Sequence, residues 1–225
     1  MKTVLVAAAL AATALLANAG EADVKKAIEA KIGKVEKMTK SPIAGMWEVV
    51  VEGDLLYVDD SGQYFLLGNL IDAKNGKNLT AERQFSMLPL NFAMKQVRGN
   101  GKGVLVTFED PNCGYCKKLA QEIQKVDNVT VYTFLYPVLG EDSHEKSKAV
   151  WCSSNKMKTW NDFMLNGKDV GKAPANCDLA GLEKSIEAGR RLRINGTPAM
   201  IFAGGERVPG FMPAAEIQKR LGAGG

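Results

Sequence analysis

The 225-residue chain carries 29 Lys and Arg residues against 25 Asp and Glu residues, which gives a formal net charge of +4 at pH 7. This small excess is not arranged in a basic run interleaved with aromatic residues, so nucleic-acid binding has little support. The hydrophobic fraction of 46% is ordinary for a globular protein, and the length allows one large domain or two small ones.

The first 19 residues have the three parts of a secretory signal peptide. Lys2 provides a positive start, residues 4–16 form an uncharged and mostly apolar run, and the Ala-Asn-Ala of residues 17–19 supplies small residues for cleavage. A membrane helix is the alternative, but the apolar run is shorter than the roughly 20 residues that a bilayer requires. We therefore expect residues 1–19 to be a signal peptide and the mature chain to be exported to an oxidising compartment where disulfides persist.

Residues 20–80 predict a small α+β domain without any cysteine. A helix is expected over residues 21–38, because apolar residues recur there at helical spacing: Val24, Ile28, Ile32 and Val35. Three or four short strands are expected over residues 45–76, separated by turns at 59–62 and 75–76. A domain of about 60 residues buries little surface alone, and an open sheet edge can pair with a second copy. We expect a homodimer through this domain.

Residues 81–101 are predicted to form a linker helix between two domains. Its helical stripe would consist of four apolar residues: Phe85, Leu88, Phe92 and Val97. Pro89 interrupts the helix, because proline lacks an N–H and clashes with the preceding turn. The polar, Gly-containing end at residues 99–101 is typical of a domain boundary. A surface helix on a single domain is the alternative.

Residues 102–225 predict a second domain with a different order of elements. An apolar strand over 103–108 leads to the pair Cys113 and Cys116, where a helix begins. A strand over 128–137, helical stretches near 145–154 and 159–165, and a helix over 179–194 follow. A hairpin over 198–211 and a closing helix over 213–221 complete the chain. This order of elements resembles the thioredoxin fold.

The resemblance extends to longer motifs. The segments CGYCKKL, AVWC, APANCD and INGTPAMIFAGGERVPGFMP are similar to those of the bacterial disulfide isomerase family DsbC/DsbG, and CGYC is closer to the DsbC member. The segment SPIAGMWEVVVEGDLLYVDDSGQYFLLGNLID resembles that family's amino-terminal dimerisation domain. The resemblance covers essentially the whole mature chain. It implies an α+β dimerisation domain, a linker helix, and a thioredoxin-like catalytic domain with a helical insertion.

The dithiol has a physical basis for reactivity. A cysteine in the first turn of a helix faces unpaired N–H groups and the positive end of the helix dipole, which stabilise a thiolate. We expect Cys113 to attack substrate disulfides and Cys116, one turn further in, to resolve the mixed disulfide. Structural zinc is the main alternative, but such sites usually combine two close pairs of Cys or His ligands, and the chain has one histidine. We expect no metal and no other cofactor.

The remaining expected site residues surround this pair. Cys152 and Cys177 favour a structural disulfide, since exported chains usually pair their cysteines; a second redox pair is the alternative. The resemblance implies that the Thr197–Pro198 bond is cis, beside the dithiol, and binds an extended substrate strand together with Gly114 and Tyr115. Thioredoxins bury an acid where this chain has Thr107. Glu109 and Asp110 are expected on a loop and receive no role in proton transfer.

These features predict a periplasmic thiol–disulfide isomerase that acts on misoxidised or unfolded secreted proteins. The resemblance implies a membrane-embedded thiol reductase of the DsbD type as electron donor. Two alternatives stay open: a dithiol oxidase or dedicated reductase on the same fold, and a holdase chaperone whose surface would include Met46, Met87 and Met94.

Overall fold

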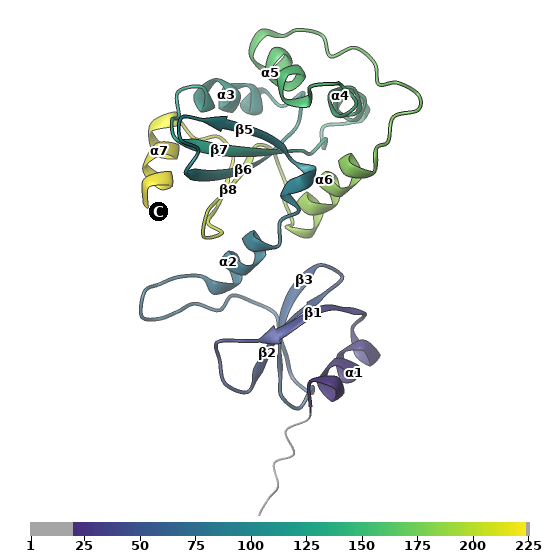
Figure 1. Ribbon diagram of the computed structural model, residues 1–225, viewed down its shortest axis with the longest axis vertical. Coiled ribbons are helices and arrows are strands. Elements are labelled where there is room, and N and C mark those ends of the chain that lie inside the picture. The colour runs from purple at the N-terminus through teal and green to yellow at the C-terminus, as the bar shows by residue number, and fades with distance from the viewer. Residues whose placement is uncertain (1–19, 224–225) are drawn as a thin grey trace, which may run out of the picture. The chain divides into compact units, whose positions relative to one another are not determined.

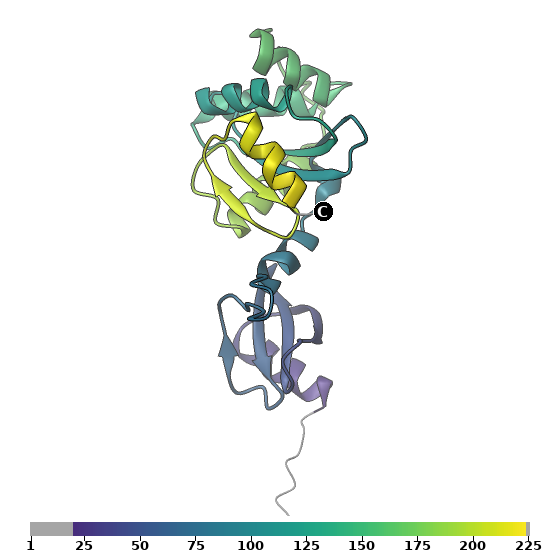
Figure 2. The ribbon, with the colours of Figure 1, turned by 90° about the vertical axis from the view of Figure 1, so that its left-hand side faces the viewer.

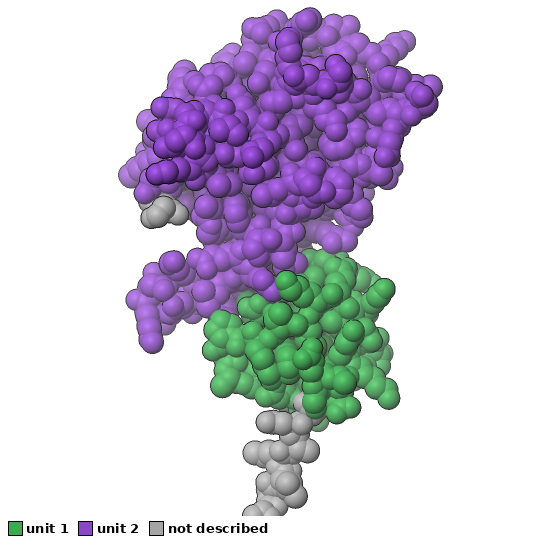
Figure 3. Space-filling view, viewed as in Figure 1, with its two compact units in different colours: residues 1–67 green, residues 68–225 purple. Residues whose placement is uncertain are grey.

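The computed structural model of the chain describes residues 20–223, so the expected signal peptide lies outside the described residues. The chain divides into two compact units, residues 1–67 and residues 68–225, which Figure 3 colours separately. Each unit has its own hydrophobic core. Within the described residues, no helix combines the length and apolar character needed to cross a bilayer.

The first unit is a helix packed on an antiparallel sheet (Figure 1). Helix α1 (Glu21–Lys31) precedes four strands in the order β1-β2-β3-β4, with bounds Val35–Lys40, Met46–Val51, Asp54–Asp59 and Phe65–Leu66. Alternate residues of β2 point to one face because side chains alternate along a strand. Trp47, Val49 and Val51 therefore meet Val24 and Ile28 of α1 in one buried cluster.

The predicted helix over residues 21–38 is too long. Helix α1 ends at Lys31, and Val35 begins strand β1 opposite Val51 of β2. Ile32, expected on the buried stripe, is 43% exposed. Pairing with β2 outweighs the helical spacing of the apolar residues, and Val35 is still buried, but as part of the sheet.

The second unit contains a five-stranded sheet in the order β5-β7-β6-β8-β9. The strands span Met94–Arg98 (β5), Gly103–Glu109 (β6), Val129–Leu135 (β7), Ala199–Phe202 (β8) and Arg207–Pro209 (β9). Strands β6 and β7 are parallel, and the other neighbouring pairs are antiparallel. The helices are α2 (Leu79–Ser86), the 3-10 turn η1 (Leu90–Phe92), α3 (Gly114–Ile123), α4 (Glu141–Trp151), α5 (Lys156–Asn166), α6 (Ala180–Arg191) and α7 (Ala214–Ala223).

Helices cover both faces of this sheet. Leu105 of β6 packs with Leu119 of α3 and Ile217 of α7, and Figure 2 shows α7 lying across the strands. On the opposite face, Phe108 of β6 packs with residues of β7 and α6. A third cluster joins α3 to the inserted helices α4 and α5 and includes both Cys113 and Cys116. The dithiol therefore lies where the thioredoxin-like core meets its helical insertion.

The segment expected as a linker helix is only partly helical. Asn78 caps α2 by accepting a hydrogen bond from the N–H of Ala81 at 2.9 Å, and the helix ends at Ser86. The interruption expected at Pro89 is observed, but Val97 lies in strand β5 and not on a helix. Pairing of β5 with β7 accounts for this difference, because it satisfies the backbone of residues 94–98 in a ladder. Met94, expected on an exposed holdase surface, is buried.

Candidate active site

The dithiol lies at the start of helix α3. Strand β6 ends at Glu109, the N–H of Cys113 bonds to the carbonyl of Asp110 at 3.1 Å, and Cys113 is the N-cap of α3. Cys113 is 7% exposed and Cys116 is fully buried one turn further in. Both carry free thiols. This arrangement gives only Cys113 access to an incoming disulfide and directs the unpaired N–H groups of the first turn toward it.

A strand that is distant in sequence completes the site. The Sγ of Cys113 donates to the carbonyl oxygen of Thr197 at 3.1 Å, and the Thr197–Pro198 peptide bond is cis. Strand β8 begins directly after this bond, at Ala199. The structure therefore brings Thr197 and Pro198 against the dithiol, as the sequence analysis expected from the family resemblance.

The residues between the two cysteines face outward. A Cβ added at Gly114 would meet no heavy atom within 4 Å. Tyr115 is 58% exposed, and its ring centroid lies 6.4 Å from that of Phe211, which also has an exposed side chain. The amino group of Lys118 lies 4.9 Å from the centre of the Tyr115 ring. The entrance to Cys113 is thus flanked by aromatic surface.

Cys116 has a strongly perturbed thiol. Burial raises the pKa of Cys116 far above its ordinary range, and the charge of nearby Glu109 raises it further. A hydrogen bond from the Asp110 backbone opposes both effects, but it is weaker. Cys116 is therefore a thiol at neutral pH until a base removes its proton.

Glu109 was misplaced by the sequence analysis. It is the last residue of strand β6, opposite Leu135 of β7, and is only 1% exposed. Its Oε1 accepts a 2.7 Å hydrogen bond from the Thr107 hydroxyl, whereas its Oε2 has no hydrogen-bond partner among the described residues. Burial raises the pKa of Glu109 from its ordinary value of 4.5 to about 7, despite this hydrogen bond. The alternation of Leu105, Thr107 and Glu109 along β6 was the signal that could have revealed it.

Asp110 follows the strand, as expected, but it is buried and has a clear structural role. Its Oδ2 accepts hydrogen bonds from the N–H groups of Val138 at 2.7 Å and Leu139 at 3.0 Å. Its Oδ1 accepts from the hydroxyl of Ser143 at 2.8 Å and from the N–H of Asn112 at 2.7 Å. One carboxylate therefore ties the turn before Cys113 to the loop and helix that follow β7.

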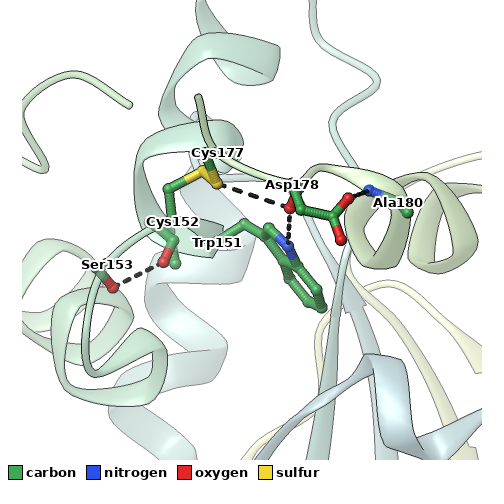
Figure 4. The surroundings of a disulfide bond; sticks show 7 residues. Trp151, Cys152, Ser153, Cys177, Asp178 and Ala180 are labelled. Atoms are coloured by element: carbon green, nitrogen blue, oxygen red, sulfur yellow. Dashed lines mark hydrogen bonds between the residues drawn. A yellow bond between two sulfur atoms is a disulfide. The ribbon is translucent and has the colours of Figure 1, made fainter. Parts of the chain in front are cut away.

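Cys152 and Cys177 form a disulfide away from this constellation. Cys152 caps the C-terminus of α4, and Cys177 lies in the loop before α6 (Figure 4). Beside the bond, the indole Nε1 of Trp151 donates to the carbonyl of Asp178 at 3.2 Å. The same ring fills the space above Gly181, where an added Cβ would lie 2.1 Å from it. The bond and this ring together fix the C-terminal end of α4 to the start of α6.

No cluster of three or more potential metal ligands occurs among residues 20–223. The site brings together two free thiols, those of Cys113 and Cys116, and the neighbouring carboxyl of Glu109. The cis peptide bond before Pro198 lies beside them. Such a site can exchange disulfides through Cys113 without any bound cofactor.

Comparison with known proteins agrees with this geometry. Residues 90–225 match the family model of a thioredoxin-like domain, and residues 15–81 match that of a disulfide bond isomerase protein N-terminal domain. The thiol:disulfide interchange protein DsbC of Escherichia coli K12 is 31% identical over 221 residues, covering 94% of this chain and 92% of that protein. The chain belongs to the DsbC family. The resemblance and the fold class predicted from the sequence are thereby confirmed.

Other DsbC relatives define the extent of the match. The probable thiol:disulfide interchange protein DsbC of Bordetella parapertussis is 45% identical over 185 residues, which are 79% of this chain. The match spans only 65% of that relative's length. The crystal structure of a disulfide interchange protein from Neisseria gonorrhoeae aligns with a TM-score of 0.56 at 35% identity, covering 60% of this chain and 96% of that one.

Proposed function

We propose that this chain is a periplasmic thiol–disulfide isomerase that rearranges wrong disulfides in exported proteins. The observation that carries the proposal is the position of Cys113. It caps helix α3, its sulfur lies 3.1 Å from the carbonyl oxygen of Thr197, and a buried second thiol stands one turn behind it. Membership of the DsbC family supports the same activity.

The reaction begins with the Cys113 thiolate. It attacks one sulfur of a substrate disulfide, forms a mixed disulfide, and releases the other substrate sulfur as a thiolate. That thiolate, or another in the substrate, attacks a sulfur again until a stable pairing results and Cys113 is regenerated. If rearrangement stalls, Cys116 attacks the sulfur of Cys113 and the substrate leaves reduced. The resulting Cys113–Cys116 disulfide then needs an external dithiol as reductant, for which we propose a membrane-embedded thiol reductase.

The surroundings of Cys113 suit an unfolded polypeptide. Thr197 lies two residues before strand β8, across the cis bond to Pro198, so its backbone is placed to pair with an extended substrate segment. Exposed apolar side chains lie around the site: Tyr115, Val138, Leu139 and Phe211. Apolar surface of this kind marks interaction sites and would hold unfolded chains with little sequence preference. Chaperone-like binding therefore accompanies isomerisation in this proposal.

We also propose that the first unit forms the homodimer interface. Its sheet ends in the short edge strand β4, and large apolar side chains are exposed beside that edge: Tyr64, Leu66 and Leu67. An exposed strand edge offers unpaired backbone groups to a second copy. A dimer would present two dithiols to one substrate. The family model matched by residues 15–81 supports this assignment.

Reactivation of a scrambled, multi-disulfide substrate in a glutathione buffer tests the activity. Cys113→Ala should abolish reactivation, because the attacking thiolate is lost, whereas Cys116→Ala should retain part of it. A holdase alone would suppress aggregation equally well with both cysteines replaced and would reactivate nothing. Equal reactivation by wild-type protein and Cys113→Ala would contradict the proposal.

A further inference from the structure

A short exposed segment joins the turn after helix α6 to the cis peptide bond beside Cys113. The backbone of Ile194 is held on both sides: its N–H donates to a carbonyl of α6 at 2.9 Å, and its carbonyl accepts from a tyrosine hydroxyl at 3.0 Å. The carbonyl of Thr197 accepts from the Cys113 thiol at 3.1 Å. Asn195 and Gly196 lie between these two anchors and are exposed. A change in the length of this segment must therefore displace one of the anchors.

An asparagine followed by a glycine can deamidate without any enzyme. The backbone nitrogen of the glycine attacks the side-chain carbonyl carbon of the asparagine. A C–N bond forms, and the amide nitrogen leaves as ammonia with the N–H proton. Glycine favours this ring closure because it has no side chain in the way and its backbone is permissive. Water then opens the cyclic imide at either carbonyl, which gives aspartate or isoaspartate, and no oxidant or metal is consumed.

The chain offers an internal comparison, because it contains four Asn-Gly pairs, at residues 75–76, 100–101, 166–167 and 195–196. In the first three pairs the glycine N–H donates to a backbone carbonyl: Gly76 to Asp72 at 2.8 Å, Gly101 to Arg98 at 3.1 Å and Gly167 to Phe163 at 2.9 Å. Among the described residues, the N–H of Gly196 has no hydrogen-bond partner. A nitrogen that donates a hydrogen bond must first lose it, so the Gly196 nitrogen is the nucleophile most ready to attack.

The asparagine side chains follow the same order. The side chains of Asn75 and Asn100 accept hydrogen bonds from backbone N–H groups at 2.9 and 3.0 Å. Asn166 is the last residue of α5, and the glycine that follows it closes the final turn of that helix. The Asn195 side chain has no hydrogen bond within residues 20–223. Asn195–Gly196 is thus the pair in which both reacting groups are free.

We propose that Asn195 is a site of spontaneous deamidation and that its conversion to isoaspartate slows the attack by Cys113. The deamidation itself rests on the exposed segment alone. Its effect on the dithiol rests on the proposed function, in which Cys113 is the attacking thiolate. The bond from the side-chain carbon of residue 195 to the Gly196 nitrogen replaces the original peptide bond in isoaspartate, so the main chain gains one methylene group.

The two products should differ in their effect. Isoaspartate lengthens the chain between the two anchors, so the Thr197 carbonyl shifts from its place beside Cys113. A misplacement of about 1 Å can cost about 100-fold in rate, so we expect the Cys113 reaction to slow about 10- to 100-fold. Aspartate keeps the length of the backbone and adds only an exposed charge. Because salt screens such a charge, it should change the rate by less than about fivefold.

Ageing of the full-length mature chain at mildly alkaline pH and physiological temperature tests the proposal. Peptide mapping by mass spectrometry, with fragmentation that distinguishes aspartate from isoaspartate, follows all four pairs in one sample. Stopped-flow reaction of the same samples with the small disulfide 5,5′-dithiobis(2-nitrobenzoate) measures the attack by Cys113. Asn195 should convert before the other three asparagines. The fraction of molecules that react slowly should equal the fraction with isoaspartate at position 195.

Two variants serve as matched controls. A Cβ added at Gly196 would meet no heavy atom within 4 Å, and the φ angle of Gly196 is not positive, so Gly196→Ala fits the segment. Its methyl group obstructs ring closure, so this variant should react like the fresh parent even after ageing. Any loss that it shows measures thiol oxidation instead. Asn195→Asp introduces the charge without the extra methylene and should stay within about fivefold of the parent.

Three results would overturn the proposal. Conversion of any of the other three asparagines ahead of Asn195 would contradict the assignment of the site. An unchanged Cys113 rate in molecules with isoaspartate at position 195 would contradict its effect on the dithiol, as would equal loss of rate in aged Gly196→Ala. The probe is a small disulfide, so none of these results depends on protein isomerisation. Failure to reactivate scrambled proteins, with the expected ageing at Asn195, would refute the proposed function alone.

Discussion

Replacing Glu109 with Gln should change how the stability of the second unit depends on pH. The folded protein holds the Glu109 proton up to about pH 7, whereas an unfolded chain loses it near the ordinary value of 4.5. Between these values the folded state binds more protons, so the free energy of unfolding falls as pH rises. The contribution is fully present below about pH 4.5 and is lost above about pH 7. Gln does not titrate, so Glu109→Gln removes this dependence.

The magnitude follows from the size of the pKa shift. One pKa unit corresponds to 1.36 kcal/mol, so a rise from 4.5 to about 7 means that Glu109 contributes about 3 kcal/mol less to the free energy of unfolding at pH 8 than at pH 4. Glu109→Gln also changes hydrogen bonding, but that effect is the same at both pH values. The difference in unfolding free energy between variant and parent should therefore shift by about 3 kcal/mol in favour of the variant between pH 4 and pH 8.

Urea denaturation of matched proteins measures this shift. Both proteins should carry Cys113→Ala and Cys116→Ala, so that no reductant is needed and the Cys152–Cys177 bond stays intact. Trp47→Phe leaves tryptophans only in the second unit, where Trp160 lines a small cavity beside Glu109. Parallel stability profiles of parent and variant from pH 4 to pH 8 would refute the reasoning that burial raises the Glu109 pKa.

Three other outcomes are expected. Asp110→Asn replaces one carboxylate oxygen with an NH2 group, which cannot accept the two hydrogen bonds that this oxygen received. Urea denaturation should therefore show a loss of about 2–4 kcal/mol in the free energy of unfolding. An unchanged midpoint would contradict the role of Asp110 in joining the turn before Cys113 to the segment after β7. The double variant Cys152→Ala, Cys177→Ala should lose about 3 kcal/mol of stability, because the disulfide closes a loop that spans 25 residues. The rate at which Cys113 reacts with the small disulfide 5,5′-dithiobis(2-nitrobenzoate) should stay unchanged, and a slower reaction would favour a second redox pair. Removal of residues 20–67 should give a monomer in light scattering that still reduces small disulfides, and a persistent dimer would place the interface outside the first unit.

The position of the dithiol could be predicted from the sequence because its determinants are local. A buried apolar strand, a Cys-x-x-Cys pair and apolar residues at helical spacing such as Leu119 and Ile123 together specify a strand, a turn and a helix start. The contact between Cys113 and Thr197 joins residues 84 positions apart, and only the family resemblance indicated it.

The errors arose where pairing between strands decides the structure. Val35 and Val97 both continue helical patterns, yet both lie in strands because β2 and β7 offer them ladders. Glu109 looks like a loop residue after the apolar run, but its pairing with Leu135 extends the strand and buries it. Three of the four hydrogen bonds that Asp110 accepts come from residues 28 to 33 positions away, which no local pattern reveals.

The redox state of the two cysteine pairs in living cells tests the central claim most directly. An isomerase needs Cys113 as a thiolate, although the expected signal peptide sends the chain to an oxidising compartment. Acid trapping, alkylation and mass spectrometry read both pairs in one sample. We predict that Cys113–Cys116 is reduced and Cys152–Cys177 oxidised at steady state. A dithiol found oxidised in cells with an intact thiol reductase would contradict the isomerase assignment and favour a dithiol oxidase.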